Sequence, residues 1–248
     1  MSSLIGIAVL APAGWTRTQT EPTPLRKEDN SGTLRQGLPG RRIGGGTRGG
    51  RIFVNEYDYL AALVTADNLS TTTAEQPSLI FYLPEMVNEQ TVEFVLRNAH
   101  DEVVYETSFQ AKKSGGMVRI EATDETTTLA LNETYQWYFS IVPDPTNRST
   151  DVTVYGNIQR VDPAHWLSEQ QIDLAQLSKI EQESPLVHAR MLHQEADLWH
   201  DAAIVLENLL NENPADTEVT AALTQLLEVA GLSAVVEIPT ANLQAKLY

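Results

Sequence analysis

Three residues with metal-binding side chains stand at helical spacing in the C-terminal part of the chain. They are His193, Asp197 and His200, at positions i, i+4 and i+7, and an unbroken helix would bring all three onto one face. Two imidazoles and a carboxylate could hold zinc. The sequence shows no fourth ligand and no supporting hydrogen bonds for such a site, and a helix break near Asp197 would scatter the three residues. We therefore predict no metal ligand here.

A glycine-rich segment has the spacing of a nucleotide-binding loop. Residues 44–49 read Gly-Gly-Gly-Thr-Arg-Gly, with glycine at the first, third and sixth positions of the dinucleotide fingerprint. That chemistry needs a hydrophobic strand before the glycines and a helix after them, because the amide end of the helix receives the pyrophosphate. Here a polar segment precedes the glycines and strand-like residues 51–54 follow. We interpret the segment as an arm that can lie closely against a sheet edge.

The remaining reactive side chains form no catalytic pattern. The chain has no cysteine, which excludes thiolate catalysis and disulfides. It also lacks a glycine-serine-glycine elbow for a serine nucleophile. Because 33 residues are acidic, pairs of carboxylates are frequent in this sequence and none of them indicates a catalytic acid–base pair. We predict a non-enzymatic protein with no catalytic residue and no cofactor, and a metal-dependent hydrolase is the least favoured alternative.

Charge is unevenly distributed along the chain. Residues 1–51 hold 8 of the 17 Lys and Arg residues and only 3 acidic residues, which leaves 9 basic and 30 acidic residues in the rest. A body this acidic repels phosphate backbones, so we expect no nucleic-acid partner. The apolar run 4–10 ends in Ala-Pro-Ala, which is typical of an export signal and its cleavage site. We interpret residues 1–13 as the remnant of an export signal whose start lies upstream, and expect a secreted or periplasmic protein whose mature chain has no membrane span.

Composition and periodicity divide the rest of the chain into three parts. Residues 14–50 are rich in Thr, Pro, Gly and Arg and predict a flexible basic leader. Residues 51–161 alternate with period two and predict a β-sandwich domain, whereas residues 162–248 have the 3.6-residue period of a helical C-terminal region. The fold class is therefore α+β.

The period-two segments predict an antiparallel, immunoglobulin-like sandwich. Short runs recur about every ten residues without helical patterns between them, and Trp137 lies in the strongest alternation, where it would anchor the core. Residues 98–101 are turn material, so the runs on either side of them predict a hairpin. The expected strands are Leu79–Leu83, Thr91–Arg97, Val103–Phe109, Met117–Ile120, Thr126–Leu131, Tyr135–Ile141 and Val152–Ile158.

Capping signals predict three or four helices after Arg160. Ser168 and Gln171 have capping-box spacing, and Ser184 followed by a proline starts another helix. The remaining signals are the end of a helix at Asn213-Pro214, a cap at Asp216 and a stop at Gly231.

Several motifs resemble one bacterial family in order and spacing. The motifs are residues 40–49, 60–64, 77–84, 135–142 and 151–160. Together with Trp199-His200-Asp201-Ala202 and residues 226–232, they resemble the mainly cyanobacterial domain of unknown function nine-two-eight over roughly residues 38–232. The resemblance implies an exported protein of unestablished activity and supplies no catalytic residue. Relatives often carry cysteines, which this chain lacks.

These observations predict an exported, non-enzymatic module that binds a protein or cell-envelope partner through its arm and an exposed sheet edge. Strand addition gives such contacts main-chain hydrogen bonds without a dedicated pocket. The alternative is a structural subunit in which the segment 51–64 completes the sheet of a neighbouring copy. Another copy of this chain is therefore a possible partner under this alternative.

Overall fold

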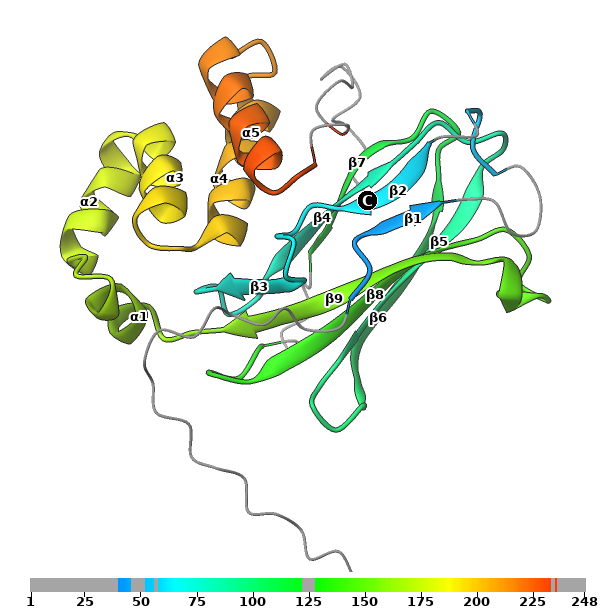
Figure 1. The fold of residues 1–248 in the computed structure, drawn as a ribbon, viewed down its shortest axis with the longest axis horizontal. Helices are drawn as coiled ribbons and strands as arrows, with labels where there is room; N and C mark the ends of the chain where they lie inside the picture. The colour runs from blue at the N-terminus through cyan, green and yellow to red at the C-terminus, as the bar shows by residue number, and fades with distance from the viewer. Residues whose placement is uncertain (1–39, 46–51, 56–57, 122–127, 233–234, 236–248) are drawn as a thin grey trace, which may run out of the picture. The chain divides into compact units, whose positions relative to one another are not determined.

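The computed structural model describes residues 40–45, 52–55, 58–121, 128–232 and 235, all of which belong to the unit Arg35–Tyr248. The expected export-signal remnant and most of the expected leader lie outside the described residues. Within the described part, nine strands form two sheets and five helices follow them (Figure 1). The α+β class predicted from the sequence is therefore confirmed.

The two sheets have four and five strands. The first sheet has the order β1 (Ile43–Gly45), β2 (Tyr59–Ala62), β4 (Ser78–Leu83) and β7 (Gly116–Glu121). The second has the order β3 (Leu69–Thr72), β9 (Val152–Arg160), β8 (Thr134–Val142), β5 (Gln90–Arg97) and β6 (Val103–Ala111). Neighbouring strands pair antiparallel, except β3 and β9, which are parallel. Residues 128–131 of the expected strand Thr126–Leu131 form only an isolated bridge, from Leu131 to Arg160.

One hydrophobic core lies between the two sheets. Alternate residues of β8 point into it, and Trp137, Phe139 and Ile141 are fully buried there, because successive side chains of a strand point to opposite faces. From the facing sheet, Phe81 stacks on Phe139 with 3.9 Å between the ring centroids. The position predicted for Trp137 is confirmed.

The predicted hairpin is formed by β5 and β6, which pair over their whole length. The side-chain oxygen of Asn98 accepts hydrogen bonds from the backbone N–H groups of His100 and Glu102 at 2.9 and 3.0 Å. Such bonds from a side chain to nearby backbone are how Asn stabilises a turn. The side chain of Asn98 therefore stabilises the turn of this hairpin, which lies at the residues where the sequence predicted it.

The described part of the glycine-rich arm joins both sheets. Ile43–Gly45, which we expected in the leader, pairs with β2 as strand β1, and Arg41 exchanges two backbone hydrogen bonds of 2.8 Å with Tyr155 of β9. Gly44 lies so close to β9 that a Cβ atom there would be 3.1 Å from a methyl group of Val152. The described residues of the arm, 40–45, therefore lie at a sheet edge, as the glycines suggested. β2, from the segment proposed for strand donation, sits between β1 and β4 of its own sheet.

The five helices are α1 (Pro163–Glu169), α2 (Leu174–Glu183), α3 (Pro185–Gln194), α4 (Trp199–Glu212) and α5 (Thr217–Val229). The boundaries predicted at Ser184, Asn213 and Asp216 are confirmed. The capping box predicted at Ser168 is wrong, because the Asp162 carboxylate accepts from His165 N–H and starts α1 earlier, so Ser168 lies inside that helix. α2 begins instead after Asp173, whose side chain accepts from Ala175 N–H.

A second hydrophobic core joins the helices to the outer face of the first sheet. Ala61, Leu63 and Ile80 from the β2 and β4 region are buried together with apolar residues of all five helices. β4 therefore buries side chains on both faces, since Phe81 and Leu79 belong to the core between the sheets. A strand covered on both sides reads as a continuous apolar run, which is what residues 79–83 show.

Candidate functional site

The residues that could have held a metal are separated by a break in the helices. α3 ends at Gln194 and α4 begins at Trp199, and Asp197 between them has a positive φ of 53°. His193, Asp197 and His200 therefore do not share one helical face. Burial lowers the pKa of His193 below its ordinary value, against the opposing influence of the Asp197 carboxylate. No group of three or more metal-ligating side chains occurs among the described residues.

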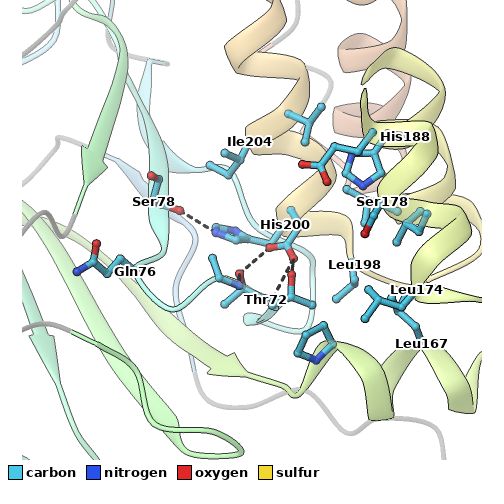
Figure 2. A pocket seen from close by; sticks show the side chains of 18 of the residues that line it. Thr72, Gln76, Ser78, Leu167, Leu174, Ser178, His188, Leu198, His200 and Ile204 are labelled. Carbon is cyan, nitrogen blue, oxygen red and sulfur yellow. Dashed lines mark hydrogen bonds between the residues drawn. The ribbon is translucent and has the colours of Figure 1, made fainter. Parts of the chain in front are cut away.

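His200 joins the first turn of α4 to the beginning of β4. Its side chain is buried, with the residue 3% exposed, and its Nε2 atom lies 2.7 Å from the carbonyl oxygen of Ser78 (Figure 2). A carbonyl oxygen only accepts, so Nε2 is the donor. Burial lowers the pKa of His200, and the nearby Asp201 carboxylate opposes that shift. The imidazole is therefore a neutral group that holds α4 on the sheet.

Asp201, the next residue, fixes the end of β3 to the same helix. Its carboxylate accepts hydrogen bonds from the hydroxyl of Thr72 at 2.6 Å, the hydroxyl of Thr73 at 2.8 Å and the backbone N–H of Thr73 at 2.9 Å. Hydrogen bonds to an ionised acceptor are about twice as strong as neutral ones. A carboxylate in the first turn also interacts favourably with the helix dipole.

A third link connects α4 to β7. Arg119 of β7 forms ion pairs with Glu207 of α4 at 2.9 Å and with Glu121 at 2.8 Å, and it also donates to the side-chain oxygen of Asn208. Glu207 is buried, so this pair lies under the helix and not on the surface. The positive charge of Arg119 is therefore matched by two carboxylates.

Between these links lies a cavity of about 360 Å³, which we call the inter-layer pocket (Figure 2). Its volume is in the range of small-molecule sites. Its walls come from β3 and the loop after it, from β4 and β7, and from helices α1 to α4. The lining residues on the helical side include Leu167, Leu174, Leu177, Ser178, Glu181, His188, Leu192, Leu198 and Ile204.

The polar part of the inter-layer pocket has an acidic balance. His188 is buried, and burial lowers its pKa while the carboxylates of Glu181 and Asp201 oppose the shift. It is therefore a neutral imidazole at pH 7. Glu181 is exposed at the pocket, and no cation of the described part of the chain forms an ion pair with it.

Sequence reasoning missed this pocket entirely. Its lining residues range from Thr72 to Val205, and no local spacing connects them. Two of the motifs that resemble the bacterial family contribute lining residues, namely residues 77–84 through Ser78 and Trp199-His200-Asp201-Ala202 through His200 and Asp201.

Fold and site together define an α+β protein in which two sheets and a helical layer line an open pocket of mixed polar and apolar character. The family model described as Domain of Unknown Function (DUF928) matches residues 43–240. The chain therefore belongs to this family, and the resemblance seen in its motifs is confirmed. No curated protein matches the sequence. None of the helices in the described residues has the length and apolar character of a membrane span.

Proposed function

We propose that this protein is a non-enzymatic binding protein that takes up a small amphipathic cation in the inter-layer pocket. The observation that carries the proposal is the pocket itself, whose helical wall is rich in leucine and also brings two carboxylates, those of Glu181 and Asp201. Binding sites of this kind combine mainly apolar walls with a few placed polar groups.

The charge of the ligand follows from the groups around the pocket. Glu181 and Asp201 bring two negative charges to it, whereas Arg119 is already paired with Glu207 and Glu121. His188 adds no positive charge, because burial lowers its pKa. The whole chain has a net charge of −16, and its field also attracts cations.

The apolar part of the ligand follows from the helical wall. Leu167, Leu177, Leu192 and Leu198 are buried, and Leu174 is 40% exposed at the mouth. A short alkyl chain on these leucines would gain about 0.8 kcal/mol for each methylene group removed from water. An alkylammonium ion combines such an alkyl chain with a positive charge that can form an ion pair with the Glu181 carboxylate.

The proposal of a binding protein, not an enzyme, rests on how the strongest acid–base groups are held. Asp201 accepts three hydrogen bonds from Thr72 and Thr73, and the Nε2 atom of His200 is directed to the Ser78 carbonyl. A general base needs to reach a proton of its substrate. Both groups are instead engaged in joining α4 to the sheets.

Saturation-transfer NMR with three probes of equal chain length tests the proposal. We expect hexylammonium to bind with a dissociation constant on the order of 1 mM, as suits so small a ligand. Hexanol should bind more weakly and hexanoate most weakly. Replacing Ser178→Leu fills the pocket from α2 and should weaken hexylammonium binding about tenfold, which corresponds to about 1.4 kcal/mol.

The matched control is Ala175→Leu, which adds a leucine to the exposed face of the same helix. It should leave binding unchanged. Equal binding of hexylammonium and hexanoate would show that the pocket does not select a cation. Equal binding of hexylammonium to both variants would show that the probe does not enter the pocket, and either result would overturn the proposal.

We also infer an immunoglobulin-like connectivity for the two-sheet body. Assigning β2, β4 and β7 to strands A, B and E, and β5, β6, β8 and β9 to C, C′, F and G, agrees with the strand order of that fold. The hydroxyl of Tyr135, at the start of β8, accepts from the backbone N–H of Ala130 at 3.0 Å, as in a tyrosine corner. Phe81 and Trp137, with ring centroids 5.5 Å apart, lie on the two strands that antibody domains join by a disulfide.

Tyr135→Phe tests this inference, because a tyrosine corner contributes to stability through its hydroxyl. We expect a loss of about 1 kcal/mol in the free energy of unfolding. An unchanged stability in urea titrations would argue against the corner and weaken the inferred connectivity.

We propose that the protein is exported to the periplasm or secreted. We also propose that its ligand comes from the cell envelope. The apolar run 4–10 followed by Ala-Pro-Ala supports it. N-terminal sequencing of the protein from fractionated cells should find a processed chain outside the cytoplasm, and an unprocessed cytoplasmic chain would refute it.

A further inference from the structure

Strand β6 is a long open edge of the five-stranded sheet. It has nine residues and pairs only with β5 among the described strands, so one row of its backbone N–H and C=O groups has no partner strand among them. The other edge strands, β1, β3 and β7, are shorter, with three, four and six residues. β6 contains no proline and no inward-pointing charge, two of the devices that block edge-to-edge pairing. Its register shifts at Val104, near its start, and the rest of the strand is regular.

The charges around β6 are arranged so that the strand is complementary to itself. Asp101 and Glu102 precede it, Lys112 and Lys113 follow it, and all four side chains are exposed. In an antiparallel pair of two copies with Thr107 opposite Thr107, Glu102 of each copy stands opposite Lys112 of the other. Opposite charges across a strand pair contribute favourably.

The same register suits the strand interior. It pairs the regular part of β6 around Thr107, beyond the bulge at Val104, and it places the charge of Glu106 opposite Ser108. Tyr105 meets Phe109 on the side of the core, where both are partly buried. A register centred on Glu106 would instead oppose two carboxylates and is disfavoured.

We propose that β6 pairs with β6 of a second copy of this chain, so that two five-stranded sheets join into one. The twofold axis passes through Thr107, and the arrangement is isologous, as in most homodimers. A contact of one strand pair is smaller than the roughly 1,600 Å² of a standard stable interface. The dimer is therefore reversible and depends on protein concentration.

Sedimentation velocity of the full chain across a concentration series tests this pairing. Lys112→Glu turns both Glu102–Lys112 pairs into like charges and should raise the dissociation constant of the dimer about tenfold. Lys179→Glu makes the same change of net charge on the exposed face of α2 and should have no such effect. The double variant Glu102→Lys with Lys112→Glu restores opposite charges and should restore the dimer.

A wild-type chain that stays monomeric at millimolar concentration overturns the proposal. The partner of the β6 edge would then have to be a strand of a different protein. A dimer that is equally stable in Lys112→Glu and Lys179→Glu overturns it as well, because the interface would then lie elsewhere. Failure of the double variant to recover would refute the antiparallel register centred on Thr107.

Discussion

The carboxylate of Asp201 holds together segments that are far apart in the sequence. Thr72, which donates to it, is fully buried and stands 129 positions away in the chain. Replacing Asp201→Ala leaves this hydroxyl and the N–H of Thr73 without their acceptor, so we expect a loss of about 3 kcal/mol in the free energy of unfolding. Urea titration would measure it. Glu212→Ala, at the exposed end of the same helix, is the control and should change stability by less than about 0.5 kcal/mol.

If Asp201→Ala lowered the free energy of unfolding by less than 1 kcal/mol, and by no more than Glu212→Ala, these hydrogen bonds would not be what joins α4 to the strands. The assignment of Asp201 to a structural role would then be wrong.

Histidine titration gives the second prediction at this scale. Burial lowers the folded-state pKa of His200, with Asp201 opposing and Arg119 reinforcing the shift, and burial also lowers the pKa values of His188 and His193. In the unfolded chain each imidazole takes up a proton near pH 6.5, whereas the folded state resists protonation. The stability that these neutral imidazoles contribute is therefore fully present above about pH 7. The free energy of unfolding falls as the pH drops below about 6.5.

Urea titrations between pH 7.5 and 5 would check this slope, and His200→Gln should reduce it because one of the three titrating groups is gone. Stability that rises as the pH falls through this interval would contradict neutral, buried imidazoles.

Single residues were predictable where their partners are local. Asp216 caps α5 by accepting from the N–H groups of Glu218 and Val219, and a motif of a few positions contains that information. The role of His200 was not predictable, because its partner carbonyl belongs to Ser78, 122 positions earlier. The spacing of His193 and His200 suggested a shared helix face, and the positive φ of Asp197 removes it.

At the scale of elements, the arm and the last helix depend on each other. α5 ends at Val229, and Gly231, just after the cap residue Ala230, has a φ of 69°. The N–H groups of Gly231 and Leu232 bond to the carbonyls of Glu228 and Leu227, a Schellman arrangement that favours glycine. The guanidinium of Arg42 donates to the carbonyl of Ala230 at this helix end. A cation at a helix C-terminus is favourable.

Arg42→Met should therefore destabilise the protein by about 1–2 kcal/mol and speed hydrogen exchange in the last turn of α5. Arg41→Met is the matched control, because among the described residues the side chain of Arg41 bonds to the carbonyl of Ile43 nearby and not to α5. Equal exchange rates in the two variants would show that the arm does not hold α5.

Strands and helices differed in how much the sequence disclosed. The alternation in β5 and β8 and the hairpin turn were predictable, because one face of each strand is buried. β1 was not, since Ile-Gly-Gly has little strand propensity and its place depends on backbone pairing with β2. α1 was missed because the capping spacing of Ser168 and Gln171 competed with the true start at Asp162.

At the scale of the whole described unit, the helical layer covers the outer face of the four-stranded sheet. The continuous apolar run of β4 is a sequence signal for this arrangement, since a strand with both faces buried loses its alternation. What the sequence could not supply is the fit between the layers. The inter-layer pocket exists because His200, Asp201 and Glu207 fix α4 against three different strand segments, and each of these contacts is long-range.

The most direct test of the account is a titration of methyl-labelled protein with hexylammonium, followed by leucine and isoleucine methyl shifts in NMR spectra. Ligand in the inter-layer pocket predicts saturable shifts at Leu177, Leu192 and Leu198, with no change at Leu96 in the core between the sheets. Shifts confined to methyl groups outside the pocket, or no saturable shift at those three leucines, would contradict a binding site between the sheets and the helices.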